Sequence, residues 1–396
     1  MPGTTGEIAA IDPRAREAAT TLPVYGQLPF VPERAAGCNI ITTDGRRILD
    51  LYGGHAVAAL GYGHPRLTAA ISEQSSKLLF QSNAVALDVR ALAAEKLVGI
   101  APDELSRVFF VNSGAEANEN ALRMACVVTN RKKVLAITQG FHGRTAAAGA
   151  VTWNSQEWYG FPSVPFDVDF IPRNDCDAVA ALIDQDIAAV IVEPVQGVAG
   201  AFDLSHEFLT TLRKCTQQNG ALLIADEVQS GIGRSGHYFA VQSHGISPDI
   251  LTSAKALGGG VPCGAVLCTD DIATHFGSGD LGTTFGGGPL AAAAIVAVID
   301  SIEAEGLLQN VREREAQIRE QCIKGPVTRI QGMGLLLGFV CDRPAIEVRN
   351  ALLEHDILTG TSADPNVLRI LAPLVLESHH VEHLADALDS IVPPLG

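Results

Sequence analysis

The chain has 396 residues, of which 47% are hydrophobic and 18% are charged. This composition excludes a largely disordered chain, and the length allows two or three domains with a large core. The 28 basic and 44 acidic residues give a formal net charge of −16, which argues against nucleic acids and anionic membranes as partners. A small anionic substrate stays compatible with this charge, because one or two local arginines suffice to bind it.

The eight cysteines are dispersed along the chain and contain no C-x-x-C pair. We therefore expect no metal site and no redox motif, and we predict a reducing, cytoplasmic environment. Residues 1–19 lack the apolar core of a signal peptide. The Ala-rich stretch 289–299 is too short to span a membrane, so we expect no membrane partner.

The first elements along the chain precede a regular pattern. Residues 1–20 are polar and are predicted to form a mobile or helical arm. Two short strands, 38–42 and 47–50, flank Asp44-Gly45, which is a good hairpin turn signal. The spacing of apolar residues then predicts a helix over 67–79.

From residue 88 onward the pattern alternates between helices and strands. We predict four helices, each followed by a strand. The helices cover 88–99, 115–129, 177–185 and 207–219, and the strands that follow them cover 107–111, 133–137, 188–192 and 221–225 in the same order. This alternation, with apolar strands, predicts a parallel sheet covered by helices. One or two helices over 289–318, the stretch 329–340, another helix and the stretch 367–371 predict a smaller α+β domain.

The stretch 221–260 carries the residues that point most directly to chemistry. Its first strand ends at Asp226, and a carboxylate there lies at the carboxyl edge of a parallel sheet, where α/β proteins bind ligands. Lys255 follows a second apolar run and can reach the same edge, where a half-buried amine becomes a nucleophile toward carbonyls. The pair suits an aldehyde cofactor, held by the lysine as a Schiff base and protonated at a pyridine nitrogen beside the aspartate. The common alternative is a solvated lysine and an ordinary loop aspartate.

The segment Gly231–Gly236 matches the G-x-G-x-x-G pattern of dinucleotide-binding proteins. That function requires the glycines to lie directly between a strand and the start of a helix. Here residues 226–229 intervene, and residues 237–239 do not resemble a helix start. We therefore interpret the segment as a loop and do not infer a dehydrogenase.

Two strings, DEVQSGIGRSG at 226–236 and SAKALGGG at 253–260, together resemble the signature of class III pyridoxal 5'-phosphate (PLP) aminotransferases, the ornithine, acetylornithine and 4-aminobutyrate group. The resemblance covers residues 35–375. It implies an α/β, fold-type-I PLP transferase with a mostly parallel, seven-stranded-type sheet flanked by helices, and a smaller α+β domain. The expected division is an N-terminal arm with part of the small domain (1–50), a large PLP-binding domain (51–288) and a C-terminal small domain (289–396).

The resemblance also assigns roles to individual residues around the cofactor ring. Asp226 would contact the ring nitrogen, Val228 would pack on the ring face and Gln229 would meet the ring hydroxyl. Lys255 would form the Schiff base and then act as the base that moves the proton. Phe141 would stack on the ring.

The cofactor phosphate is expected at the start of the helix that opens at residue 115. Small residues at a helix N-terminus leave backbone N–H groups free to bind a phosphate, and the helix dipole assists. Ser113 with Glu116 also forms a capping-box pattern, and both interpretations can hold. The resemblance assigns the phosphate to Ser113, Gly114 and Ala115, and to Thr284 acting on the neighbouring subunit of a homodimer with shared active sites.

The residues that would bind the substrate match the family pattern less closely than those around the cofactor. The resemblance assigns the substrate α-carboxylate to Arg144 and a second anionic group to Arg369. Val198 stands where many relatives have a glutamate that pairs with the arginine, so either another acid replaces it or Arg369 is permanently available. His55 stands where the family has tyrosine or an apolar residue, and it either contacts the substrate or is structural.

We therefore predict an aminotransferase that moves a terminal amino group from an N-acetylornithine-like acylated diamino acid to 2-oxoglutarate, giving a semialdehyde and glutamate. Another class III activity, on 4-aminobutyrate or another ω-amine, or an aminomutase, is the alternative. A non-catalytic regulatory relative is a further alternative, against which the intact Asp226 and Lys255 argue.

Overall fold

The computed structural model describes residues 12–391 of the chain. Part of the predicted N-terminal arm, residues 1–11, lies outside this range, and the arm continues as helix α1 (Pro13–Ala18). None of the helices within 12–391 combines the length and the apolar character needed to cross a membrane.

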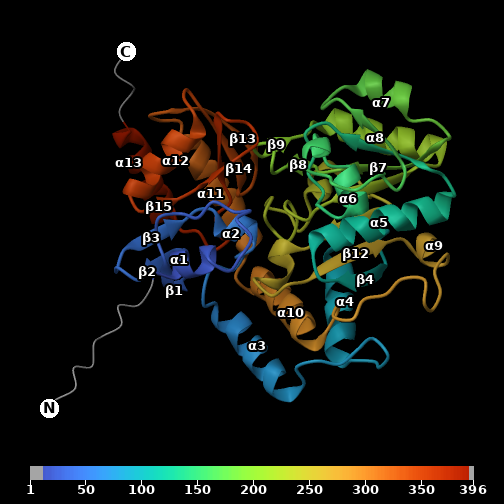
Figure 1. Ribbon diagram of the computed structural model, residues 1–396, viewed down its shortest axis with the longest axis horizontal. Coiled ribbons are helices and arrows are strands. Elements are labelled where there is room, and N and C mark those ends of the chain that lie inside the picture. Colours follow the sequence, from blue (N-terminus) through green and yellow to red (C-terminus); the bar gives the residue numbers. More distant parts are fainter. Residues whose placement is uncertain (1–11, 392–396) are drawn as a thin grey trace.

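A seven-stranded sheet organises the middle of the chain (Figure 1). Its order is β4 (Arg107–Val111), β12 (Gly264–Cys268), β11 (Ile250–Ser253), β10 (Leu222–Asp226), β7 (Ile187–Val192), β5 (Lys133–Ile137) and β6 (Asp167–Ile171). Only β12 runs antiparallel to its neighbours within this sheet. The prediction of a mostly parallel, seven-stranded sheet is confirmed, although sequence analysis did not identify β6 and β12.

Both faces of this sheet are buried because its strands carry apolar residues on both sides. Along β7, Val190 and Val192 belong to one core cluster, while Ala189 and Ile191 belong to a second one. This is the period of two expected of a strand. The first cluster also contains residues of helices α4 (Asp88–Ile100) and α8 (His206–Asn219), and the second contains residues of helix α5 (Gly114–Thr129).

The helices of this part agree with the expected alternation. They are α3 (Pro65–Lys77), α4 (Asp88–Ile100), α5 (Gly114–Thr129), α6 (Ala146–Ala150), α7 (Cys176–Leu182), α8 (His206–Asn219) and α9 (Asp270–Ala273). Gly306, in the left-handed region at φ +62°, divides the predicted segment 289–318 into α10 (Pro289–Ala304) and α11 (Leu307–Gln321). Helix α10 packs against α3 and α4.

Residues 32–50 and the segment from residue 327 to residue 390 together form the other part of the molecule. A sheet of β1 (Pro32–Ala36), β2 (Asn39–Thr42) and β3 (Arg47–Asp50) is extended by β15 (Ile357–Leu358), which pairs with β3 in parallel. The predicted hairpin around Asp44-Gly45 is the antiparallel pair β2 and β3. A second, antiparallel sheet has the order β13 (Val327–Met333), β14 (Leu336–Cys341), β17 (Val367–Ile370) and β16 (Gly360–Thr361). Helices α12 (Ala345–Glu354) and α13 (Ser378–Ser390) complete this part. The predicted domain boundaries stay a prediction.

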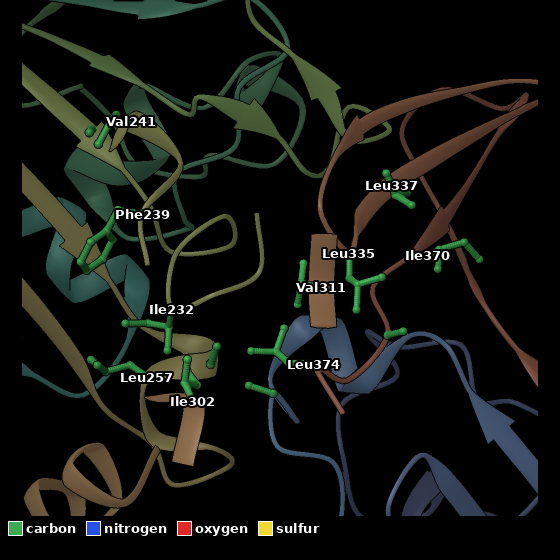
Figure 2. Packing of buried hydrophobic residues seen from close by; sticks show 14 of the residues in the cluster. Ile232, Phe239, Val241, Leu257, Ile302, Val311, Leu335, Leu337, Ile370 and Leu374 are labelled. Atoms are coloured by element: carbon green, nitrogen blue, oxygen red, sulfur yellow. The ribbon is translucent and has the colours of Figure 1, made fainter. Parts of the chain in front are cut away.

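The two parts share one continuous hydrophobic cluster (Figure 2). Ile232 and Leu257 contribute to it from the middle of the chain, Ile302 from α10, and Leu335 and Leu374 from the C-terminal part. The segment Gly231–Gly236 consists of turns and is followed by the short 3-10 helix η2 (Ala240–His244). Its interpretation as a loop is therefore confirmed, and Ile232 of this loop packs in the cluster that the two parts share.

Candidate active site

A cavity of about 510 Å³ opens at the carboxyl edge of the large sheet. Most of the residues that sequence analysis assigned to the cofactor line it, together with the substrate candidate Arg144: Ser113, Gly114, Ala115, Phe141, Asp226, Val228, Gln229 and Lys255. They come from four separate stretches of the chain. The fold therefore brings together what the motifs only suggested.

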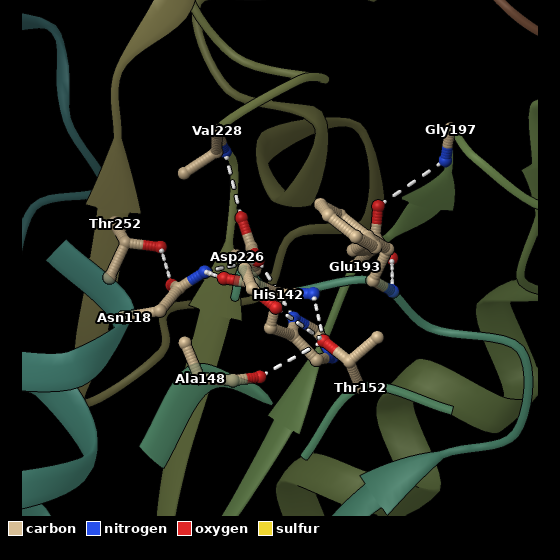
Figure 3. Close-up of polar contacts among 11 residues, drawn as sticks. Asn118, His142, Ala148, Thr152, Glu193, Gly197, Asp226, Val228 and Thr252 are labelled. Atoms are coloured by element: carbon tan, nitrogen blue, oxygen red, sulfur yellow. Dashed lines mark hydrogen bonds and ion pairs between the residues drawn. The ribbon is translucent and has the colours of Figure 1, made fainter. Parts of the chain in front are cut away.

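Asp226, the last residue of β10, lies in the floor of the cavity and is almost fully buried. Its Oδ2 accepts a hydrogen bond from Asn118 Nδ2 at 2.7 Å and lies 2.7 Å from His142 Nδ1, and its Oδ1 accepts one from the Val228 amide at 3.0 Å (Figure 3). Asn118 Oδ1 in turn accepts a hydrogen bond from Thr252 Oγ1 at 2.7 Å. These contacts hold the carboxylate in one orientation.

His142 is a site residue to which sequence analysis assigned no role. It is buried, and its backbone amide donates to Thr152 Oγ1 at 2.9 Å. Burial opposes the charged form of the imidazole, but the hydrogen bond and the charge of Asp226, with that of Glu193, raise the pKa of His142 overall. A titratable residue inside the motif between Phe141 and Arg144 was the signal that could have identified it.

Lys255 follows β11 and begins the short 3-10 helix η3 (Lys255–Gly258). Its backbone φ of +44° lies in the left-handed region, a strained conformation that is enriched at functional sites. Its amine has no hydrogen bond or ion pair with any residue of 12–391. Burial lowers the pKa of Lys255, against the opposing charges of Asp226 and Glu193. An unpartnered amine with a lowered pKa is suited to attack a carbonyl.

The start of α5 offers a cradle for an anion. Ser113 Oγ caps the helix by accepting the Glu116 amide at 3.2 Å. The Glu116 carboxylate reaches the Asn112 amide at 2.6 Å, one residue before the position that a capping box requires. A Cβ added to Gly114 would lie 2.6 Å from Val228 Cγ1, so only glycine allows the helix start to approach this wall of the cavity.

The remaining wall also fits PLP. Gln229 lines the cavity, and its buried Oε1 has no hydrogen-bond partner among the described residues, so a polar group of a ligand can satisfy it. Phe141 provides an aromatic surface. The residues present thus match the parts of PLP: a carboxylate, an aromatic ring, a helix N-terminus for the phosphate and a lysine for the aldehyde.

Glu193 is a second buried acid at the cavity to which sequence analysis assigned no role. It accepts the backbone amides of Phe141, at 2.8 Å, and of Gly197, at 3.3 Å. Burial raises the pKa of Glu193 to about 7. These bonds connect the loop that carries Phe141 with the segment that leads to Val198, which itself lines the cavity.

The substrate candidates lie in different settings. Arg144 is exposed at the cavity with its guanidinium 5.5 Å from the centre of the Trp158 ring, and it has no ion pair with a residue of 12–391. Arg369 is buried. The backbone carbonyl of His55 accepts a hydrogen bond from Gln229 Nε2 at 3.5 Å. Thr284 is exposed in the loop before α10 and does not line this cavity.

Comparison with known proteins identifies the family. The family model of the class III aminotransferases, which describes the sequences of that family, matches residues 22–392 of this chain. The acetylornithine aminotransferase of Corynebacterium efficiens is 39% identical over 385 residues, covering 95% of each chain. That of Streptomyces coelicolor is 40% identical over 380 residues, covering 94% of this chain and 93% of the relative.

A solved structure agrees with this assignment. The ornithine aminotransferase of Toxoplasma gondii, whose active site is partly occupied by PLP, superposes with a TM-score of 0.89 at 27% identity, covering 95% of this chain and 92% of that one. The cavity, the residues that fit PLP and these similarities agree, and the chain belongs to the PLP-dependent class III aminotransferases.

Proposed function

We propose that this aminotransferase transfers the terminal amino group of an N-acetylornithine-like acylated diamino acid to 2-oxoglutarate, giving a semialdehyde and glutamate. The observation that carries the proposal is Arg144, an arginine at the cavity with no carboxylate partner among the described residues. A guanidinium in this state is suited to bind a substrate carboxylate bidentately. The relatives named acetylornithine aminotransferases, at 39% and 40% identity, support this donor.

PLP, when bound, supplies an electron-withdrawing ring that stabilises negative charge at the carbon bearing the amino group. The chain would contribute the charges and hydrogen bonds around that ring. Asp226, oriented by Asn118 and His142, would hold a proton at the ring nitrogen. The N-terminus of α5, from Ser113 to Ala115, would bind the phosphate.

Lys255 would act twice. Its amine would first hold the cofactor, and once the substrate has replaced it, the same amine would accept the proton that leaves the carbon bearing the amino group. The lowered pKa of Lys255 supports this role, because a base must be unprotonated near neutral pH. Phe141 and Val228 would enclose the ring and exclude water from it.

We also propose a homodimer with shared active sites, in which Thr284 binds the phosphate in the partner subunit. The exposed position of Thr284 on the loop 282–288 supports this role. Next to it, Phe285 is 64% exposed, and its ring lies tilted beside that of Phe80, which is 42% exposed, with the ring centres 5.2 Å apart. An exposed apolar pair of this kind suits an interface between subunits. The eight free cysteine thiols support a reducing, cytoplasmic location.

A single-turnover absorbance assay tests the donor. The PLP-loaded protein is mixed in turn with N-acetylornithine, ornithine, 4-aminobutyrate and glutamate, and the loss of the visible PLP band is recorded. We expect N-acetylornithine and glutamate to convert the cofactor to its amine form. Conversion by 4-aminobutyrate or another ω-amine alone would exclude the proposed donor and favour the alternative activity.

A further inference from the structure

Glu193 is a buried acid that the proposed function leaves without a role. It follows β7 directly, and β7 lies between β5 and β10, the strand that ends at Asp226. The residue lines the cavity and is only 6% exposed, yet it has no ion pair with a residue of 12–391. A buried charge without a paired charge is retained only where hydrogen bonds hold it. The hydrogen bonds of Glu193 therefore indicate its role.

The carboxylate of Glu193 joins two loops. Its Oε1 accepts a hydrogen bond from the backbone amide of Phe141 at 2.8 Å, and its Oε2 accepts one from that of Gly197 at 3.3 Å (Figure 3). Both partners are N–H donors, so both oxygens must act as acceptors. Only the ionised carboxylate offers two unprotonated oxygens, because a neutral acid carries a hydroxyl in one position and an amide carries an NH2 group there.

The loop after β5 depends on this contact. It contains Gln139, whose φ of +64° lies in the left-handed region although the residue is not a glycine. A residue in this conformation persists only where its surroundings hold it. On one side of it, Gln196 Nε2 donates to the Thr138 carbonyl at 3.0 Å. On the other side, Glu193 accepts the amide of Phe141, which lines the cavity, so this aromatic ring is positioned from the neighbouring strand.

The Gly197 backbone supports a second wall of the cavity. A Cβ added to Gly197 would lie 1.7 Å from Gln229 Oε1, so this backbone lies directly against the Gln229 side chain. Gln229 Oε1 is the buried atom that a polar group of the cofactor can satisfy. The Gly197 carbonyl accepts from Arg369 at 3.3 Å, and Arg369 also donates to the Tyr52 hydroxyl at 2.8 Å. Glu193 and Arg369 therefore hold the same glycine from its amide and from its carbonyl.

Several charged groups act on Glu193. Burial raises the pKa of Glu193 to about 7, together with the charge of Asp226 and against the charges of His142 and Lys255. The charge of Glu193 also acts on Arg369. The ionised form, which accepts both amides, is therefore present above a pH of about 7 and is lost as the pH falls through this value.

We propose that Glu193 is a positioning residue, whose ionised carboxylate clamps the loop of Phe141 and the Gly197 backbone against the cofactor. When Glu193 binds a proton, one of the two amides loses its acceptor, and the wall that this amide holds is released. The retention of PLP then depends on the pH near neutrality. The inference rests on the proposed function in one respect, because Phe141 and Gln229 are the residues that would contact the cofactor. It does not depend on which amino donor is used.

The test measures how tightly the PLP-loaded protein retains its cofactor, as a dissociation constant obtained from the visible PLP band after dilution. It is done at two pH values, about one unit below and about one unit above the pKa of Glu193. Glu193→Gln keeps the shape of the side chain and removes the charge. At the higher pH we expect this variant to raise the constant roughly tenfold, the effect of losing a hydrogen bond to a charged group. At the lower pH the wild type is itself mostly protonated, so the ratio should fall to about twofold.

Amide hydrogen exchange tests the clamp without a substitution. In the wild-type protein, the segments 138–142 and 196–198 should exchange faster at the lower pH, after correction for the intrinsic effect of pH on exchange. Helix α8, which does not line the cavity, is the internal reference. In Glu193→Gln these two segments should exchange at the faster rate at both pH values.

Glu227→Gln is the matched control. Glu227 is also buried, burial also raises its pKa to about 7, and it accepts the Val241 amide at 2.8 Å, but it does not line the cavity. We expect its dissociation constant for PLP to stay within about twofold of the wild type at both pH values, the usual scatter for remote substitutions. An equal loss of PLP in both variants would show that any buried acid has this effect, and would overturn the proposal.

Two results on Glu193→Gln would overturn it as well. One is a dissociation constant within about twofold of the wild type at the higher pH, and the other is a loss of affinity that is equal at both pH values. Exchange in the two wild-type segments that does not respond to pH would contradict the clamp even if the variant failed to fold. If the clamp behaves as expected but the protein does not transaminate N-acetylornithine, the proposed donor is wrong and the clamp stands.

Discussion

The residues proposed to hold the cofactor, here called the cofactor side, and those proposed to bind substrates, here called the substrate side, lie in different settings. On the cofactor side, Asp226 ends a strand of the central sheet and is bonded to Asn118 of α5 and to His142, all of them buried. On the substrate side, Arg144 is exposed, His55 lies in a left-handed turn and Arg369 comes from a strand of the C-terminal part.

This difference separates two requirements of the enzyme. Asp226 must keep one orientation beside the cofactor, so it stands at the end of a strand and its carboxylate accepts hydrogen bonds from the protein. The groups that recognise substrates must remain available, so they keep donors free for a ligand. We expect substitutions on the cofactor side to reduce turnover, and those on the substrate side to change substrate affinity.

The largest effect is expected from Lys255→Ala. Removing the amine removes both the attachment of the cofactor and the proton carrier, so turnover should fall to the detection limit and the visible PLP band should change. Lys133→Ala is the control, because Lys133 is the first residue of β5 and so lies at the edge of the sheet opposite to the cavity. Its amine pairs with the carboxylate of Asp169 at 2.6 Å. Normal turnover in Lys255→Ala would exclude the mechanism.

Arg144→Ala should act on affinity. We expect the KM for substrates with an α-carboxylate to rise by roughly tenfold to a thousandfold, at about 1.4 kcal/mol per factor of ten, because a charge-assisted pair is lost. Arg173→Ala is a matched control, since Arg173 also lies over an aromatic ring, that of Phe202 at 4.1 Å. An unchanged KM would remove Arg144 from the substrate site.

His142→Asn tests the cofactor side without touching the cofactor itself. Losing the contact with Asp226 should lower kcat by roughly tenfold to a hundredfold, with a smaller change in KM, because the carboxylate loses one of its hydrogen bonds. The PLP dissociation constant should rise as well. His275→Asn, at an exposed histidine, is the control. A rise in KM with constant kcat would place His142 on the substrate side.

The smallest effect is expected on stability, at Glu227. Burial raises the pKa of Glu227 from 4.5 to about 7, against its hydrogen bonds from Ser230 and the Val241 amide. The folded state therefore binds this proton more tightly than the unfolded state. The stabilising contribution of the protonated acid is present below pH 4.5 and is lost as the pH rises through about 7.

Glu227→Gln removes this titration. The free energy of unfolding of the variant minus that of the wild type should increase by about 1–3 kcal/mol from roughly pH 5 to roughly pH 8, because only the wild type loses stability as this acid ionises. Chemical denaturation at the two pH values measures it. A difference between the two proteins that does not change with pH would show that Glu227 does not titrate in this range.

Much of the fold could be predicted because its information is local. The alternating apolar runs around 107–111, 133–137, 188–192 and 221–225 are strands, with ends displaced by no more than one residue. Strand β12 was missed since it follows the glycine-rich turn after Lys255 and lacks a flanking helix of the expected length. The hydrogen bond from the Asn112 amide to the Glu116 carboxylate could not be predicted either, because it depends on the path of the chain from β4 into α5.

By itself, the sequence determined the family, the α/β class and the cofactor-side candidates, because Asp226 and Lys255 lie in contiguous motifs whose local geometry follows from neighbouring residues. Only the tertiary structure decided the partners of these groups. His142 and Asp226 are 84 residues apart, and Tyr52 and Arg369 are 317 apart. Contacts across such separations depend on how sheets and loops pack, and a single glycine, Gly360, decides whether the Tyr52 ring fits. No local pattern encodes that packing.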